Sequence, residues 1–406
     1  MKKILPFFTL LLLLTSQLIG QSRYLDSLFV PVVSQQGVVY GQADALSFPY
    51  FFESSTYLQD LEMDVYEPQG DTDPMRPCIV YAHGGAFLLG SRTDAPVVKF
   101  CNAMAAKGYV VVSMSYRLGF NFTDSASAER AVYRGVQDMK AAIRYVKEQA
   151  TSWSIDTSRV FAAGNSAGSV AAIHASYLDE SERSSIQSTF NSPDLGCGSC
   201  TGNTLTHGDV PLAIANLWGA IADTTFIGSN NNVPMVSFHG TDDDSVFPGH
   251  DRPFSLPTFP KMMGSDLLTS RLETLGIETE YWKFYGEGHE TWGVSGNTPY
   301  FDTIVDKTAE FFYSYLTPPL STNQIENTVD WNIYPNPVSD ILTIDLKNVD
   351  YQNIRISIVN ALGQIVQTGK FNTHKTTIST QQLQSGWYGL ILESDDFRAT
   401  KSFLKN

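Results

Sequence analysis

Residues 161–170 read FAAGNSAGSV and contain the pattern Gly164-x-Ser166-x-Gly168, a serine flanked by glycines directly after an apolar run. An apolar strand before this pattern and small residues after it predict a sharp strand-to-helix turn. Such a turn holds the serine backbone in a disfavoured conformation and leaves no room for side chains at the two glycines. Ser166 is therefore a candidate nucleophile at a helix N-terminus, and a polar residue in a glycine-rich loop is the alternative.

A second glycine motif, YAHGGAFLLGS, follows another apolar run earlier in the chain. The tetrahedral intermediate of acyl transfer needs N–H donors for its oxyanion, and glycines just past a buried strand let backbone N–H groups point at it. The order of the two motifs predicts Gly85 and Ala86 as donors, with Ala167, the residue after the nucleophile, as their partner. A plain strand-ending turn is the alternative interpretation of this segment.

A serine nucleophile needs an imidazole base, and the base needs a carboxylate to orient it. The loop YGEGHETWG offers His289 after the last strand expected in this part of the chain. The loop SFHGTDDDSVFP offers Asp242, Asp243 and Asp244, and the residues alone leave the choice among the three open. The chain order serine, aspartate, histidine is that of the α/β-hydrolase fold.

From about residue 57 onward, short β-rich runs alternate with longer helical patterns. Runs such as CIVYAHGG and YVVVSMSYR predict strands buried on both faces, and SAERAVYRGVQDMKAAIRYVKEQA predicts a long amphipathic helix. The alternation predicts an α/β fold: a mostly parallel sheet with helices on both faces and reactive groups at the carboxyl ends of the strands.

His83 and His239 begin His-Gly turns and are expected to bond backbone groups. Residues 177–210 and 244–262 interrupt the alternation and are candidate lid segments.

Together, HGGAF, SYRLGF and GNSAG resemble the α/β-hydrolase superfamily, and within it the esterases with an HGG oxyanion motif, closest to the carboxylesterase group. The resemblance covers about residues 55–316. Its pattern H-G-T-x-D-x-x-V implies that Asp243 is the triad acid, and its pattern G-x-G-H implies that His289 is the base. Asn165 departs from the family, which usually has Asp or Glu there, and Ala86 stands where the lipase-like branch has a third glycine.

The resemblance implies a serine ester hydrolase that works through an acyl-enzyme without a cofactor, on a small-molecule or carbohydrate-linked ester. A serine peptidase of the prolyl-oligopeptidase type is one alternative, although the propeller of that family is missing from this sequence. A catalytically inactive hydrolase fold that serves adhesion is another, because a fold does not determine a function. Four aromatic residues are candidates for a substrate pocket, each with core packing as the alternative: Phe87, Trp218, Tyr281 and Trp292.

After residues 317–330, a proline-containing polar segment that we interpret as a linker, the hydrophobic period changes to two. The runs ILTIDL, IRISIV and WYGLILES predict a small all-β sandwich over residues 331–406. The stretch from IYPNPVSDILTIDL to GWYGLILESDDFRATKSFLKN is similar to the C-terminal sorting domain of the bacterial type IX secretion system. That similarity implies the type IX machinery as a partner, passage across the outer membrane, and release or attachment at the cell surface.

Residues 1–21 have the pattern of a signal peptide, with two lysines, a leucine run and the small residues Ser16 and Gly20 near a cleavage point. The catalytic domain then occupies residues 22–316. An uncleaved membrane anchor is the alternative, but no charged stop-transfer flank follows the leucines, so we expect no stable membrane span.

The formal net charge of −15 disfavours nucleic acid and anionic lipid surfaces as partners. The pair Cys197 and Cys200 predicts a local disulfide, because export favours oxidation. A zinc site would need a second pair of thiolates, and Cys78 and Cys101 lie in or beside apolar segments typical of a core. We therefore expect no metal.

Overall fold

The computed structural model describes residues 22–186, 192–228, 230–293, 296, 298–316, 330–347, 354–360, 365–371, 373–393 and 398–406. The signal peptide expected at residues 1–21, and all of the expected linker 317–330 except its last residue, lie outside this range. The chain divides into two compact units, Met1–Pro318 and Pro319–Asn406, and each is described by itself.

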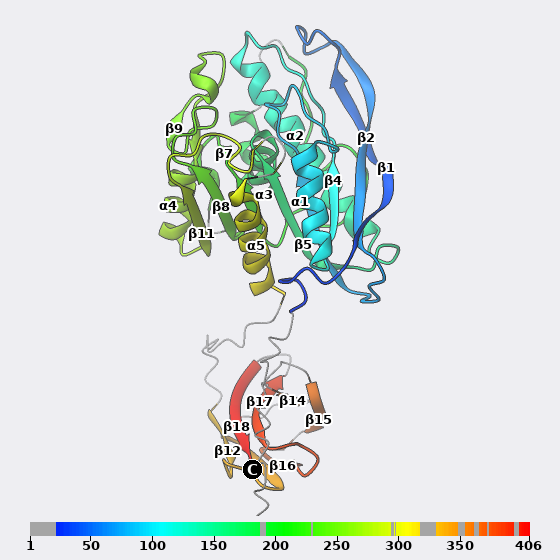
Figure 1. The fold of residues 1–406 in the computed structure, drawn as a ribbon, viewed down its shortest axis with the longest axis vertical. Helices are drawn as coiled ribbons and strands as arrows, with labels where there is room; N and C mark the ends of the chain where they lie inside the picture. The colour runs from blue at the N-terminus through cyan, green and yellow to red at the C-terminus, as the bar shows by residue number, and fades with distance from the viewer. Residues whose placement is uncertain are drawn as a thin grey trace, which may run out of the picture. The chain divides into compact units, whose positions relative to one another are not determined.

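Among the described residues, eight strands of the first unit form one sheet in the order β1-β2-β4-β3-β5-β6-β8-β11 (Figure 1). The strands are β1 (Pro31–Leu46), β2 (Thr56–Pro68), β3 (Arg76–Ala82), β4 (Val110–Met114), β5 (Ile155–Asn165), β6 (Ile214–Leu217), β8 (Met235–Gly240) and β11 (Thr279–Phe284). Strand β2 pairs antiparallel with β1 and β4, and every other neighbouring pair is parallel. The mostly parallel sheet expected from the sequence is confirmed.

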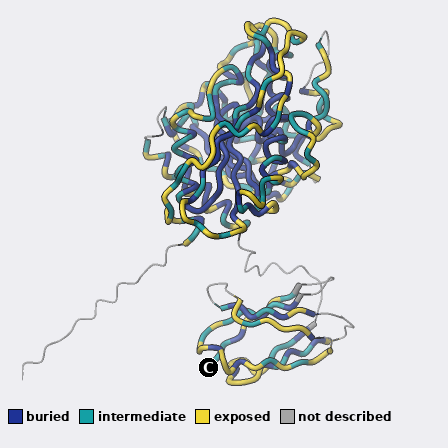
Figure 2. The backbone as a smooth tube through the Cα atoms, turned by 90° about the vertical axis from the view of Figure 1, so that its right-hand side faces the viewer, coloured by how far each residue is buried: buried dark blue, intermediate teal, exposed yellow. Residues whose placement is uncertain are grey.

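Helices cover both faces of this sheet, as the alternating pattern predicts (Figure 1). One face packs against α1 (Ala95–Ala106) and α5 (Pro299–Ser314), and the other packs against α2 (Ser125–Glu148), α3 (Ala167–Tyr177) and α4 (Ser265–Leu275). The two apolar clusters between helices and sheet form the buried interior of the unit (Figure 2). None of the described helices is both long and apolar enough to span a membrane.

Helix α2 carries several buried charged side chains. Glu53, in the loop between β1 and β2, lies 2.7 Å from Arg130 Nε and 2.9 Å from Arg134 Nη1. Arg117 and Asp138 form a second buried pair at 2.8 Å. Since an unpaired charge in such a place is very unfavourable, these ion pairs determine where the β1–β2 loop can rest on the helix.

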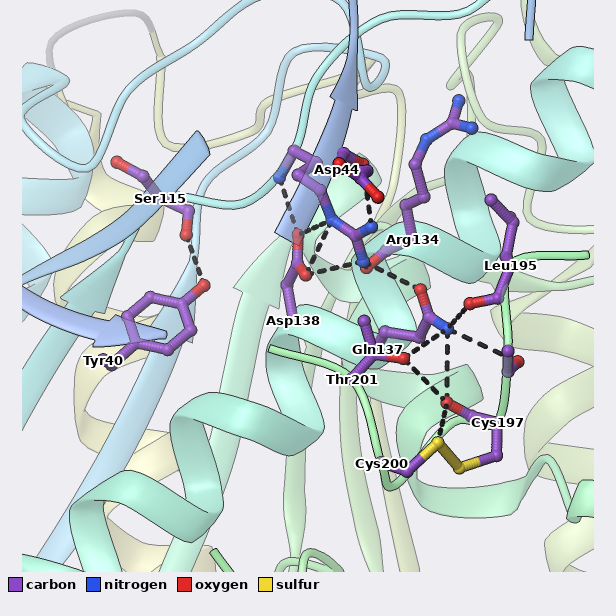
Figure 3. A network of polar contacts seen from close by, with 12 residues as sticks. Tyr40, Asp44, Ser115, Arg134, Gln137, Asp138, Leu195, Cys197, Cys200 and Thr201 are labelled. Atoms are coloured by element: carbon purple, nitrogen blue, oxygen red, sulfur yellow. Dashed lines mark hydrogen bonds and ion pairs between the residues drawn. A yellow bond between two sulfur atoms is a disulfide. The ribbon is translucent and has the colours of Figure 1, made fainter. Parts of the chain in front are cut away.

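The segment after α3 also packs on α2 (Figure 3). Gln137 Nε2 donates to the carbonyl oxygens of Leu195 and Cys197 and to Thr201 Oγ1, at 2.8, 3.2 and 3.0 Å. Cys197 and Cys200 form a disulfide within this loop. The connections between residues 178 and 264 also contain short elements. These are η1 (Glu180–Ser185), η2 (Thr224–Phe226), η3 (Pro253–Ser255) and a small sheet of β7 (Ala220–Ile221), β10 (Met262–Gly264) and β9 (His250–Asp251).

The second unit is all-β over its described residues, as the sequence predicts. One antiparallel sheet contains β12 (Asp330–Tyr334), β13 (Ile341–Lys347) and β16 (Lys375–Ser379), and the other contains β15 (Ile365–Phe371), β14 (Ile354–Asn360), β17 (Gly386–Glu393) and β18 (Arg398–Lys405). Both sheets contribute to one apolar core that includes Ile344, Ile358 and Phe403. The alternating side chains seen in the sequence therefore point into a shared interior.

The substitution Glu53→Gln should lower the free energy of unfolding of the first unit at pH 7 by about 3–5 kcal/mol, because it leaves two buried arginines without their carboxylate. Burial raises the pKa of Glu53, but Arg134 and Arg130 outweigh burial and lower that pKa below its ordinary value. The stabilisation is therefore present above the unfolded pKa of about 4.3 and is lost as the pH falls through the folded pKa. Urea unfolding across pH measures both effects.

Glu273→Gln is the matched control, because Glu273 is exposed on α4. Its unfolding curve should follow that of the wild type at every pH. A Glu53→Gln variant as stable as this control would contradict the assigned role of the cluster.

Candidate active site

Ser166 lies at the turn between β5 and α3, with φ 51° and ψ −121°. This conformation is unfavourable for a residue with a side chain, and close backbone packing maintains it. A Cβ at Gly168 would lie 2.1 Å from the Ala82 carbonyl oxygen, and one at Gly164 would lie 2.5 Å from the Gly168 carbonyl carbon. The flanking glycines are thus required for steric reasons, as the sequence pattern indicates.

The loop after β3 brings backbone N–H groups beside this turn. Gly85, Ala86 and Phe87 have φ values of 117°, 54° and 58°. In the described part of the chain, the N–H groups of Gly85, Ala86 and Ala167 donate to no other protein group. They are therefore available to an oxyanion.

Asn165 fills the position at which the sequence departs from related families. Its Oδ1 accepts a hydrogen bond from the hydroxyl of Tyr81 at 3.0 Å. A Cβ at Gly84 would lie 2.7 Å from Asn165 Nδ2. The uncharged side chain thus packs directly under the loop after β3 and helps to place it.

The loops after β8 and β11 are held together by their backbones. Asp242 N donates to Glu287 O at 2.9 Å, and a Cβ at Gly240 would lie 2.2 Å from the same carbonyl oxygen. This contact sets Asp243, from the first loop, beside His289, from the second. A larger residue than glycine at position 240 would push the two loops apart.

Ser166, His289 and Asp243 form a continuous hydrogen-bonded chain. His289 Nε2 lies 2.9 Å from Ser166 Oγ, and His289 Nδ1 lies 2.7 Å from Asp243 Oδ2. A carboxylate only accepts, so Nδ1 carries the proton and Nε2 faces the serine hydroxyl as an acceptor. The Asp243 side chain is fully buried, whereas Asp242 and Asp244 are exposed. Of the three adjacent aspartates, Asp243 alone contacts His289 among the described residues.

The charge of Asp243 is stabilised inside the protein. Its Oδ1 accepts from the backbone N–H groups of Ser245 and Val246, each at 2.9 Å. Burial raises the pKa of Asp243, but hydrogen bonds from His239 and His289 outweigh burial and lower the pKa well below its ordinary value. The carboxylate therefore remains ionised at neutral pH.

An apolar pocket opens beside Ser166. Its walls come from Phe87 in the oxyanion loop, from Val170 of α3, and from Phe120, Phe254 and Phe259. The rings of Phe120 and Phe254 each contact the ring of Phe259, with centroids 5.6 and 5.7 Å apart. The pocket therefore offers a water-poor surface directly next to the serine hydroxyl.

The candidates for the surroundings of the site divide between the core and the pocket. Trp218 and Trp292 are fully buried in the core, where the Trp218 ring packs edge-on against His289, and Tyr281 lies on β11 away from the pocket. Of the four aromatic candidates only Phe87 lines the pocket. Trp218 and Trp292 belong to the apolar cluster that packs under α1 and α5. The described part of segment 177–210 packs on α2 and supplies no pocket residue, whereas segment 244–262 supplies a whole wall.

His239 has a partner that the sequence did not predict. It bonds the carbonyl of Val246 at 2.7 Å, in line with the expected backbone contact, but its Nε2 also lies 3.1 Å from Asp243 Oδ2. His83 bonds only backbone through Nδ1, to Gly84 O at 2.7 Å. The pattern H-G-T-x-D contains both His239 and Asp243, but their contact depends on how the loop after β8 folds back.

The described residues contain no group of three or more histidine, cysteine, aspartate or glutamate side chains arranged to hold a metal ion. Cys78 and Cys101 are buried thiols, and burial raises the pKa of each far above its ordinary value. Both are packing residues, as their apolar surroundings in the sequence indicate.

The strand order, the strained serine turn and the glycine loop after β3 define an α/β-hydrolase domain. Comparison with known families supports the same class and adds the second unit. Residues 63–194 match the BD-FAE family, and residues 332–406 match the family described as a secretion system C-terminal sorting domain. These matches confirm both resemblances seen in the sequence, to an HGG-type α/β-hydrolase and to a C-terminal sorting domain.

The curated relatives are similar over one segment. Carboxylesterase NlhH of Mycobacterium tuberculosis is 36% identical over 111 residues, which are 27% of this chain and 32% of the relative. The neuroligin-like protein glit-1 of Caenorhabditis elegans is 34% identical over 124 residues, which are 30% of this chain and 16% of that protein. The aligned part is thus at most about a third of these two relatives. Among solved structures, esterase 2 of Thermogutta terrifontis phosphonylated by cyclosarin has a TM-score of 0.47 at 19% identity, covering 70% of this chain and 94% of that chain.

The sorting domain has a direct consequence for location. A C-terminal domain of this family directs its chain into the secretion pathway, so the protein is exported to the cell surface or released.

The substitution Gly168→Ala should disrupt the serine turn, because the new Cβ meets the backbone of Ala82 rather than a movable side chain. We expect a loss of about 1–3 kcal/mol in unfolding free energy and slower labelling of Ser166 by a fluorophosphonate probe. Gly208→Ala is the matched control, since its Cβ would approach only the end of the Lys147 side chain, at 3.9 Å. Wild-type stability and labelling in Gly168→Ala would refute the steric account.

Proposed function

We propose that this protein is an exported serine esterase that hydrolyses carboxylic esters through an acyl-enzyme. The observation that carries the proposal is the chain of hydrogen bonds from Ser166 through His289 to Asp243, which opens directly on an apolar pocket. The similarity of one segment to carboxylesterases supports the same reaction. In this proposal residues 22–316 form the catalytic domain, residues 317–330 a linker, and residues 331–406 the sorting domain.

The first half of the reaction transfers the acyl group to the enzyme. Ser166 Oγ attacks the ester carbonyl carbon while its proton passes to His289 Nε2, which faces it at 2.9 Å. The carbonyl oxygen gains negative charge and accepts from the N–H groups of Gly85, Ala86 and Ala167. As the intermediate collapses, the carbon–oxygen bond to the alcohol breaks, and the alcohol takes the proton from Nε2.

The second half returns the enzyme to its starting state. A water molecule attacks the acyl carbon and gives a proton to His289 Nε2, and Ser166 leaves with that proton when the acid is released. Asp243 keeps the imidazole in the required tautomer and stabilises its positive charge without becoming protonated itself. Both halves use only these side chains and water, so the proposed reaction needs no cofactor.

The lining of the pocket favours an ester with an apolar acyl group. Phe254 and Phe259 would contact such a group, because they line the same pocket as Ser166. A charged acyl group would lose its hydration there without gaining a partner. We propose a small-molecule or carbohydrate-linked alcohol for the other half of the substrate, and the type IX secretion machinery as the partner of the sorting domain.

The substitution Ser166→Ala should abolish hydrolysis of p-nitrophenyl acetate and butyrate and leave the unfolding transition intact, because it removes only the attacking oxygen. The assay compares release of p-nitrophenol by the variant and the wild type at equal protein concentration. Turnover at the wild-type rate in the variant would reject Ser166 as the nucleophile.

The same assay separates the alternatives to an esterase. A wild-type protein that cleaves aminoacyl-anilides faster than the esters would be a peptidase of the prolyl-oligopeptidase type. A wild-type protein inactive on both panels and unreactive toward a fluorophosphonate would be an inactive fold that serves adhesion.

A chain that ends at Pro318 should keep its esterase activity in cell lysates but should not reach the culture medium or the outer surface. The reason is that the catalytic residues all precede this point, whereas the sorting family matches only residues 332–406. Fractionation of cells that produce the full-length and the shortened chain measures the difference. Normal export of the shortened chain would contradict the sorting role.

A further inference from the structure

A second imidazole shares the carboxylate oxygen that orients His289. His239 Nε2 lies 3.1 Å from Asp243 Oδ2, the same atom that lies 2.7 Å from His289 Nδ1. The side chain of His239 has no solvent exposure, and it comes from strand β8 itself rather than from the loop. It is therefore a rigid group placed against the buried side of the proposed triad.

Neighbouring groups determine the tautomer of His239. The carbonyl oxygen of Val246 lies 2.7 Å from Nε2, and a carbonyl only accepts, so Nε2 carries a proton. That N–H lies between Val246 O and Asp243 Oδ2. On the other side of the ring, Nδ1 lies 2.8 Å from Ser265 Oγ and accepts from its hydroxyl when the ring is neutral.

The hydrogen-bonded chain continues beyond Ser265 into the core. Asn216 Nδ2 donates to Ser265 Oγ at 3.0 Å, so the serine hydroxyl is free to donate toward His239. Asn216 Oδ1 in turn accepts from Ser169 Oγ at 2.7 Å and from Gly219 N at 2.8 Å. Asn216, Ser265 and Ser169 are fully buried. The donors Ser169 and Gly219 fix the amide of Asn216, the amide fixes the hydroxyl of Ser265, and that hydroxyl faces His239.

We propose that His239 is a positioning residue for the triad acid: its Nε2–H holds Asp243 Oδ2 in line with His289 Nδ1, and the buried Ser265–Asn216 chain keeps that N–H pointed at the carboxylate. This inference rests on the proposed esterase reaction. It assigns a role to a buried polar chain that the reaction itself does not use.

The hydrogen-bond capacity of the carboxylate explains why a second donor matters. A carboxylate offers about four lone-pair sites. The N–H groups of Ser245 and Val246 occupy Oδ1, and the two imidazoles occupy Oδ2, so each site has a donor. Without His239, Oδ2 loses one of its two donors, so it is held less firmly in line with His289, and its negative charge is shared with one imidazole instead of two.

The surroundings contain few other charges that would complicate a pH measurement. The titratable groups that act on the Asp243 carboxylate are His239 from β8 and His289 from the loop after β11. Glu287, in the same loop as His289, accepts a hydrogen bond from Tyr300 at 2.8 Å. Trp218 and Ser166, which contact His289, carry no charge. The carboxylates next in sequence, Asp242, Asp244 and Glu290, are at least partly exposed to solvent.

The test compares His239→Leu, which removes the donor, with His239→Gln, whose amide reaches a similar position and keeps an N–H. In His239→Leu we expect kcat for p-nitrophenyl butyrate to fall about 10- to 100-fold with little change in KM, because the base is misaligned while the pocket is untouched. The acid limb of the kcat/KM profile should move to higher pH, because an Asp243 that has lost one donor stabilises protonated His289 more strongly. His239→Gln should restore most of kcat and the position of the acid limb.

His174→Leu is the matched control for loss of a buried imidazole. His174 accepts from Ala222 N at 3.0 Å and has its other nitrogen 2.7 Å from Val170 O, away from Asp243. This variant should be less stable, with the acid limb unchanged. Equal pH profiles in wild type and His239→Leu, or equal losses in His239→Leu and His239→Gln, would overturn the proposal.

Two further measurements keep the test decisive. Should His239→Leu fail to fold, Ser265→Ala removes the hydroxyl that donates to His239 Nδ1 and loosens the hold on the ring, while Val246 O still keeps the proton on Nε2. A shift of the acid limb in the same direction is expected, and an unchanged limb would count against the proposal. The downfield proton resonance of His289 Nδ1–H reports on the Asp243 contact without any turnover. Its shift in His239→Leu but not in His174→Leu would support the positioning role even if the esterase proposal failed, and an unshifted resonance would refute it.

Discussion

The site depends on close backbone packing at positions where a side chain would not fit. The serine turn rests on the end of β3 through Gly168, and the loops of the acid and the base meet through Gly240. Each contact is between main-chain atoms of two segments that are far apart in sequence. The close-packed interior has no free volume at these positions for an extra methyl group. The relative positions of nucleophile, base and acid are therefore consequences of backbone shape, and the strain at Ser166 is maintained by the whole sheet.

A second constraint concerns buried charge. The unit keeps Glu53, Asp138 and Asp243 away from water, and each is surrounded by donors or cations. The need to pair each buried carboxylate has a different structural consequence at each of these places. Around Glu53 and Asp138 it attaches loops to helix α2, whereas around Asp243 it produces an ionised group that faces an imidazole.

Much of this arrangement follows from the sequence, because its local patterns have local causes. The glycine spacing around Ser166 and the order of strands and helices are short-range signals, and the structure has the sheet that they indicate. The choice of Asp243 over its neighbours required a family pattern, since three adjacent carboxylates look alike before folding. The pocket wall was not predictable, because Phe254 and Phe259 lie in a segment without periodicity. The sequence does not show that these two rings line the pocket while the ring of Trp218 is buried in the core. His239 was missed for the same reason, because its second partner comes from the way the loop folds back.

The pocket wall around Phe254 and Phe259 is built from one irregular segment, whereas the reactive groups sit on strand ends and glycine turns. Substitutions at Phe254 and Phe259 would therefore change the shape of the pocket, whereas Ser245 and Val246, at the start of the same segment, also hold Asp243. The substrate range of such an enzyme can therefore evolve through changes in one loop segment, while the strand ends that carry Ser166 and His289 stay the same.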